Sequence, residues 1–409
     1  MNRLVGIGLS GLALLGAGFI AVTGLAPGGE IVSQCGAAEG PAEFRVLAPI
    51  ESGNLLLFPV VRSSKPLGST PFLTLDEGIK SGQVEVTEAG KVRGLVRPRP
   101  SIPSDGPYRP APTPQHRPYR GDQVNTLVLI NDSGKPLLLL AGEIVTGGKQ
   151  DRVIARDRIV PPTGDPVDLG VFCIEPGRWT ESSATFGASA GTSAGGFMVQ
   201  PRVREKAMVM KDQHEVWASV NDSVSQMAVA AGSPAASGSV HGPPRTLNTT
   251  SYARAMQDSN VSAKVDEAVA PVMKSREQVL AQLRQQHAIG VVVAVRGEIV
   301  WADIFAESDL LARYWTKLVR SYAAESLLPG DSRARPTISD AQHFLDAPSG
   351  GTETSEGNVG VYRFRELRSG TTETFVLESL LPGTGYEVHI SKLMLRGELR
   401  RTATPEIYR

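Results

Sequence analysis

Residues 125–154, "NTLVLINDSGKPLLLLAGEIVTGGKQDRVI", set strand-like apolar runs on either side of polar turns. Apolar runs separated by Gly, Pro, Asn, Asp and Ser are typical of β-strands joined in hairpins. The turn residues "NDSGKP" predict a hairpin over 125–145, and "PPTGDP" predicts a second hairpin over 152–175. Two hairpins in succession imply an antiparallel sheet with one face covered.

The strand pattern continues on both sides of this stretch. Strands are expected at 54–61 and 84–88, with a short helix between them for which Thr74 is the N-cap. A further hairpin is expected at 288–305, where Arg296 and Gly297 form the turn. Three more strand-like runs, at 359–367, 372–380 and 386–395, end the chain.

Amphipathic helices are expected between these strands, because apolar residues recur there at helical spacing. Pro271 should kink or divide one of them, and Ser308 is expected to cap the helix over 308–327. The apolar stripes consist of Val216, Val220, Val224 and Met227, of Val261, Val265, Val269 and Met273, and of Leu310, Tyr314, Leu318 and Tyr322. The sequence thus predicts an α+β fold, with antiparallel β-hairpins forming a sandwich- or barrel-like sheet packed with several amphipathic helices.

The first residues have the composition of a targeting signal. Arg3 precedes a long apolar stretch and then small residues, which predicts a signal peptide or an N-terminal membrane anchor over 1–37. We therefore expect a bacterial-type exported protein that is periplasmic, extracellular or anchored to the membrane by its N-terminus. Contact with a membrane is expected only through this segment, if it is not cleaved.

The rest of the chain is expected to form one α+β domain over 39–400, interrupted by three loops. A Pro-rich basic segment at 97–121 has no apolar period, and two segments at 181–198 and 229–251 are rich in Gly, Ala and Ser. No particular oligomeric state is indicated.

Composition argues against several functional classes. The 42 basic residues balance 42 acidic ones, so no net field favours nucleic acid as a partner. The six histidines show none of the usual metal-binding spacings, and we expect no metal and no cofactor. Only His389, inside a strand-like run, is of interest. With only Cys35 and Cys173 in the chain, Cys173 is expected to be a free, buried thiol.

A polar cluster is expected where the two predicted hairpins meet. In register, the end of the strand at 167–173 lies beside "GGKQDR" at 147–152, which brings "CIEPGRW" close to that turn. The backbone N–H groups of Gly147 and Gly148 can converge on an anion, to which Lys149 and Arg152 add positive charge. The candidate ligand-binding residues are Glu143, Gly147, Gly148, Lys149, Gln150, Arg152, Cys173, Glu175, Arg178 and Trp179.

Three interpretations of this cluster remain open. Three carboxylates (Glu143, Asp151 and Glu175) face three cations (Lys149, Arg152 and Arg178), and this balance favours a structural network of paired charges. The cluster could instead hold a carboxylate or phosphate of a small anionic ligand. It could also be a hydrolytic site, with Glu143 or Glu175 as general base or Cys173 as nucleophile.

Several motifs in fixed order resemble one family. These are "FLTLDEGIKSGQVEVTE", "LLLLAGEIVTGGKQDRVI", "VFCIEPGRW", "HEVWASV" and "VVAVRGEIVWADIFAESDLLARYWTKLVRSYA". They are similar to the ARG (ADP-ribosylglycohydrolase) and rhodanese-phosphatase-superfamily-associated protein domain family, over about Phe44 to Leu395. The family's name implies a link to ADP-ribose or phosphate-ester metabolism, and the resemblance supplies no catalytic residues.

The interpretation that the sequence favours is an exported binding or accessory module for a small anionic ligand. Lys149 and Arg152 would receive the anion with the two glycines, Arg178 and Trp179 would flank it, and the glutamates would orient the cations. The alternatives are a hydrolase of a phosphate or glycosidic ester using Glu143 or Glu175, and a structural envelope protein with no ligand.

Overall fold

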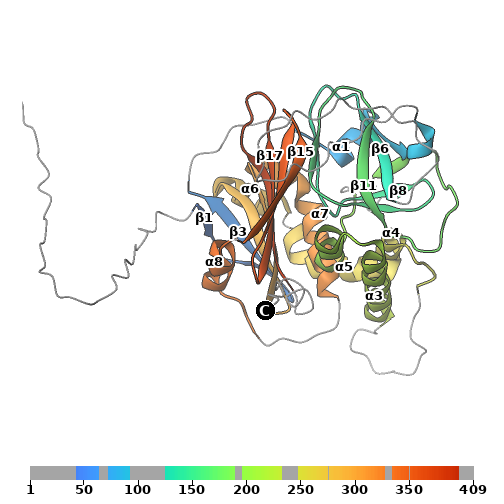
Figure 1. Ribbon diagram of the computed structural model, residues 1–409. Coiled ribbons are helices and arrows are strands. Elements are labelled where there is room, and N and C mark those ends of the chain that lie inside the picture. Colours follow the sequence, from blue (N-terminus) through green and yellow to red (C-terminus); the bar gives the residue numbers. More distant parts are fainter. Residues whose placement is uncertain are drawn as a thin grey trace, which may run out of the picture. The chain divides into compact units, whose positions relative to one another are not determined.

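The computed structural model describes residues 43–63, 72–92, 125–188, 196–232, 247–274, 276–327, 334–349 and 351–395. The predicted export segment at 1–37 and the Pro-rich loop at 97–121 lie outside these ranges. The predicted α+β class is confirmed, because helices and mainly antiparallel sheets make up the described chain (Figure 1). Among the described residues, no helix combines the length and the apolar character needed to cross a bilayer.

The largest sheet has nine strands, all paired antiparallel, and contains the predicted hairpin at 288–305. In that hairpin Val295 lies opposite Glu298, and Arg296 and Gly297 both have positive φ, as a two-residue hairpin turn requires. The strand order is β1-β3-β13-β14-β18-β17-β16-β15, and β2 pairs with β3. The strands are β1 (Phe44–Val46), β2 (Ile50–Ser52), β3 (Leu55–Arg62), β13 (Ala288–Val295), β14 (Glu298–Phe305), β15 (Thr352–Asn358), β16 (Tyr362–Arg368), β17 (Thr372–Ser379) and β18 (Glu387–Met394).

Helices cover both faces of this sheet, which explains why β3 and β13 are apolar without alternation. Leu55 and Leu57 of β3 belong to the core that includes helix α7 (Ser308–Ser326), whereas Leu56 and Phe58 pack with helix α8 (Ile338–Asp346). In Figure 1, α7 and α8 lie on opposite sides of β3.

A second sheet of six strands curls into a barrel. Its order is β12-β8-β9-β11-β6-β5, and an isolated bridge between Thr87 and Thr185 joins its two edges. Its interior is filled by apolar side chains from all six strands, among them Val86, Val145 and Phe186. The strands are β5 (Val84–Glu88), β6 (Thr126–Asn131), β8 (Ile144–Gly147), β9 (Arg152–Ile154), β11 (Val167–Cys173) and β12 (Phe186–Ala188).

The hairpin expected at 125–145 does not form, and of the one expected at 152–175 only the base forms, where β9 pairs antiparallel with β11. Strand β6 pairs with β5 and β11, whereas β7 (Leu137–Leu139) pairs with β10 (Arg158–Val160) and, in parallel, with β4 (Leu73–Thr74). Each predicted turn therefore carries the chain from one sheet into another. Strand β7 is buried on both faces, so it lacks the alternation that would have fixed its partner.

Helix boundaries follow local capping in some places only. Thr74 caps α1 (Leu75–Lys80) with a full capping box, as predicted. Ser308 is not the cap of α7, because that helix begins at Ser308 and Glu307 is its N-cap. Pro271 does not divide its helix, α5 (Ser259–Lys274).

The other helical elements are the short 3-10 helix η1 (Ala89–Lys91), α2 (Pro201–Glu205), the π-helix η2 (Lys206–Met210), α3 (Gln213–Gly232), α4 (Tyr252–Gln257) and α6 (Arg276–Gln285).

Both predicted Gly/Ala/Ser loops contain regular structure at their ends. The loop expected at 181–198 includes strand β12, and Phe197 and Met198 at its end are buried in the core. The loop expected at 229–251 begins inside α3 and ends at Ser251, the N-cap of α4. Residues 189–195 and 233–246 fall outside the described chain.

A buried ionic network ties the barrel region to the large sheet. His389 of β18 is fully buried, with its Nδ1 atom 2.5 Å from Asp157 and its Nε2 atom 3.2 Å from Asp303. Asp303 also accepts from Arg204, Tyr322 and Trp301. Asp157 follows β9, accepts from the backbone N–H of Ala141, and so connects the barrel strands to β14 and β18. Two carboxylates thus balance two cations, and all four side chains are buried.

This network predicts a pH dependence of stability. Burial alone would lower the pKa of His389, but Asp157 and Asp303 raise it from 6.5 to about 9. A raised folded-state pKa contributes stability that is complete below 6.5 and is lost as the pH rises through 9. The free energy of unfolding in urea should therefore fall over this range more steeply for wild type than for His389→Gln. Parallel curves for the two proteins would contradict the assignment.

Candidate functional site

Strands β8, β9 and β11 bring the predicted polar cluster together at one end of the barrel. Arg152 at the start of β9 lies directly opposite Cys173 at the end of β11, as the sequence predicts. The turn over 147–151 and the loop after Cys173 therefore meet. All the predicted site residues except Glu143 lie in this region.

Glu143 belongs to a different network, which corrects the prediction that it orients Lys149 and Arg152. It is fully buried, and its carboxylate accepts from Lys317 of α7 at 2.6 Å and from the backbone N–H of Leu140 at 2.7 Å. Lys317 also contacts Asp76 at 2.9 Å. Burial raises the pKa of Glu143. Glu143 and Lys317 are 174 residues apart in the chain, so no local sequence pattern predicts that they pair.

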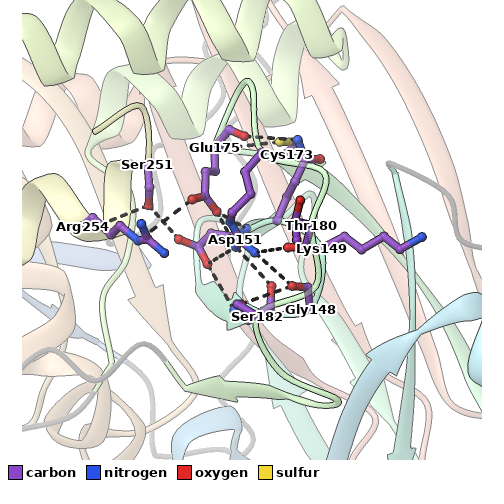
Figure 2. A network of polar contacts seen from close by, with 12 residues as sticks. Gly148, Lys149, Asp151, Cys173, Glu175, Thr180, Ser182, Ser251 and Arg254 are labelled. Carbon is purple, nitrogen blue, oxygen red and sulfur yellow. Dashed lines mark hydrogen bonds and ion pairs between the residues drawn. The ribbon is translucent and has the colours of Figure 1, made fainter. Parts of the chain in front are cut away.

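The centre of the cluster is an ion-pair network around Asp151 (Figure 2). Arg178 lies 2.5 Å from Glu175 and 3.5 Å from Asp151. The backbone N–H of Asp151 donates to Glu175, and its Oδ2 atom accepts from Ser251 at 2.7 Å. Burial raises the pKa of Asp151, and the hydrogen bond to Glu175 raises that of Arg178. Gln150 donates its side-chain amide to the carbonyl of Glu175.

The backbone N–H groups expected to receive an anion are occupied by groups of the protein itself. Gly147 donates to Asp151, Gly148 donates to the Ser183 hydroxyl, and Lys149 donates to Glu88. The glycine turn is therefore held by internal acceptors and presents no vacant anion nest.

Arg152 and Lys149 lie beside the indole of Trp179. The Lys149 Nζ atom is 5.1 Å from the ring centroid and the Arg152 Cζ atom is 5.9 Å from it, distances at which cation–π attraction operates. Figure 2 shows the Lys149 side chain extending away from the ion pairs around Asp151. Cys173 is a buried thiol without a disulfide, as predicted, and burial raises its pKa, which disfavours the thiolate that a nucleophile needs.

A polar pocket of about 280 Å³ opens next to this network. Two guanidinium groups border it: that of Arg178, and that of Arg254 on α4, whose side chain is 58% exposed. The Arg254 pocket, as we call it, is lined by Thr146, Gly147, Asp151, Arg178, Ser182, Ser183, Ala253, Arg254 and Gln257. A larger hollow of about 950 Å³ between β14, β18 and α8 contains none of the predicted site residues.

The charge balance of the cluster differs from that expected from the sequence. Glu143 is absent from it, whereas Glu88 and Arg254 are present, so cations exceed carboxylates by one. The cations are Lys149, Arg152, Arg178 and Arg254, and the carboxylates are Glu88, Asp151 and Glu175. No sequence pattern predicted Arg254 at this site, because it lies on helix α4, beyond a Gly/Ala/Ser-rich segment.

No metal ligation is evident in the part of the chain that the structure covers. It contains no group of three or more His, Cys, Asp or Glu side chains that could hold a metal ion.

Gly148→Ala should destabilise the protein. Gly148 has a φ of +50°, and an added Cβ would overlap the ring of Phe186 and lie 2.8 Å from the Glu88 carboxylate. Left-handed backbone costs about 1–2 kcal/mol and overpacking about 1–3 kcal/mol, so we expect a loss of about 2–5 kcal/mol in urea unfolding. Gly187→Ala is the control, because an added Cβ there meets nothing within 4 Å. Equal effects of the two substitutions would contradict this account of the turn.

Comparison with known proteins places the chain in one family. No curated protein and no solved structure matches it. A family model described as the ARG and Rhodanese-Phosphatase-superfamily-associated Protein domain matches residues 43–393, in agreement with the resemblance seen in the sequence motifs. The chain therefore belongs to the family of ARG and Rhodanese-Phosphatase-superfamily-associated Protein domains.

Proposed function

We propose that the protein is a binding or accessory module for a small anionic ligand, which it holds in the Arg254 pocket. The observation that carries this proposal is the convergence of Arg178 and Arg254 on one small polar pocket, in whose lining Asp151 is the one carboxylate among the described residues. Arg178 is fixed by Glu175 at 2.5 Å, whereas Arg254 forms a long ion pair with Glu175, from its Nε at 4.0 Å.

The pocket has the chemistry to recognise a carboxylate or phosphate. Guanidinium groups bind both in a bidentate manner. Ser182, Ser183 and Gln257 also line the pocket and carry polar side chains. A volume of about 280 Å³ suits a sugar phosphate or a dicarboxylic acid better than a large cofactor.

We assign the anion to Arg178 and Arg254, whereas the sequence predicted that Lys149 and Arg152 receive it. A hydrolase using Glu143 has less support, because that carboxylate is buried against Lys317. The Glu175 carboxylate is also paired, because it forms an ion pair with Arg178 and accepts a hydrogen bond from the backbone N–H of Asp151. A purely structural role remains the rival, since the same ion pairs hold two loops together.

The N-terminal sequence adds export to the proposal. The segment at 1–37 would direct the domain to the periplasm, the cell surface or the medium, and the ligand would be one found there. The name of the family associates its members with ADP-ribosylglycohydrolase and with a phosphatase superfamily. This association makes ADP-ribose and phosphate esters the first compounds to test.

Arg254→Ala should abolish ligand binding without a large loss of stability. Its side chain is mostly exposed and forms one long ion pair, so removing it costs at most about 1 kcal/mol. A thermal-shift screen of full-length wild type against phosphate, ADP-ribose, sugar phosphates and dicarboxylates should give a rise in melting temperature. The variant should lack this rise.

Arg284→Ala is the matched control, because Arg284 is 53% exposed and also forms a single ion pair, with Asp309. It should respond to the ligand as wild type does. If no compound raises the melting temperature, and Arg254→Ala melts far below wild type, the network is a structural clasp and the binding proposal is wrong.

A further inference from the structure

The guanidinium of Arg152 is buried, and two of its three nitrogen atoms have no hydrogen-bond partner among the described residues. Its side chain is fully inaccessible to solvent, and Nη1 donates to the carbonyl of Gln150 at 2.8 Å. Nε and Nη2 have no hydrogen-bond partner among the described residues. Arginine stays protonated in proteins, so this charge cannot be relieved by loss of a proton.

The two unused donors form one edge of the guanidinium, and that edge binds carboxylates elsewhere in this molecule. Arg368 donates through Nε and Nη2 to Glu373 at 2.6 and 3.1 Å. Arg313 uses the same two nitrogen atoms for Glu77. Such side-on pairs are bidentate and charge-assisted. Arg152 presents the same edge, but the described chain places no carboxylate within ion-pair distance of it.

Arg152 lies at the end of the barrel interior. Alternate residues of a strand share a face, so Arg152 points to the same side as Ile154, which packs in the barrel core. Its neighbour across the ladder on β8, Val145, belongs to that core as well. Barrel mouths are common places for ligands because the surrounding strands hold side chains rigidly around a concave end.

Trp179 covers this end. Its ring lies over both Arg152 and Lys149, yet 44% of the residue is exposed, which is unusual for so large an apolar side chain. It stands on the loop after β11, outside any strand or helix. The ring therefore shields the cations without being locked into the core.

We propose that the barrel end beneath Trp179 is a second binding site, where the Nε and Nη2 edge of Arg152 holds a carboxylate or phosphate group. Trp179 moves aside to admit the group, and Lys149 at the rim contacts it as a second cation. Glu88 supplies one negative charge nearby, so the two cations retain an excess charge that a bound oxyanion neutralises. This site is separate from the Arg254 pocket and does not depend on it.

The test uses the full chain carrying Arg254→Ala, so that the pocket of the proposed function does not contribute. Sodium phosphate and sodium acetate are titrated separately against sodium chloride at equal ionic strength. Melting temperature is recorded together with the Trp179 emission, obtained by difference from Trp179→Phe. At least one anion should raise the melting temperature and change the emission, both saturably. A response to phosphate alone indicates a phosphate group, and a response to acetate alone indicates a carboxylate.

Arg152→Gln should abolish both responses. Arg320→Gln is the matched control: Arg320 is also buried with Nε and Nη2 unused, but its Nη1 is paired with Asp266. This variant should respond as its parent does. No response to either anion, or an equal response in Arg152→Gln, would overturn the proposal and mean that water alone serves the two donors.

A second variant keeps the test decisive if Arg152→Gln does not fold. Trp179→Ala retains Arg152 and removes the cover, so the anion association rate, read from NMR line broadening of phosphate or ¹³C-labelled acetate in both proteins, should rise by about tenfold, the change expected when a barrier falls by 1.4 kcal/mol. An unchanged association rate would show that Trp179 does not control access to Arg152, and would overturn the proposed site.

Discussion

The fold depends on the buried ion network in which His389 lies between Asp157 and Asp303. Asp157 lies in the segment that follows barrel strand β9, Asp303 in β14 and His389 in β18, so the network fixes the barrel against the large sheet. Arg204 completes the balance, and its guanidinium lies 4.6 Å from the Trp301 ring. Losing one partner of such a network leaves a buried charge and costs about 3–5 kcal/mol.

The two polar regions nearest the predicted site show what distinguishes structural charges from candidate binding groups. Lys317 is held by both Glu143 and Asp76, and these carboxylates raise its pKa although burial acts to lower it. Arg152 has no such partner within ion-pair distance, and burial lowers its pKa. Lys317 thus has carboxylate partners within the protein. The guanidinium of Arg152 keeps hydrogen-bond donors that, in our proposal, a bound anion satisfies.

Local sequence patterns predicted the elements that local forces determine. The Thr74 capping box, the turn at Arg296 and Gly297, and the meeting of Arg152 with Cys173 all follow from short-range rules. The crossing from β6 to β7 was not predictable, because Leu137 to Leu139 are buried on both faces and carry no alternation. The partners of Glu143 and the approach of Arg254 were also missed, since both arise from contacts between distant segments.

The central claim is that the cluster at the barrel end recognises an oxyanion and is more than a clasp between loops. The most direct measurement is a high-resolution crystal structure of the protein grown in phosphate. The account predicts tetrahedral density in contact with Arg254 and Arg178, with Glu175 still paired to Arg178. Water alone in that pocket, with the Arg254 guanidinium folded onto Glu175 through two nitrogen atoms, would contradict it.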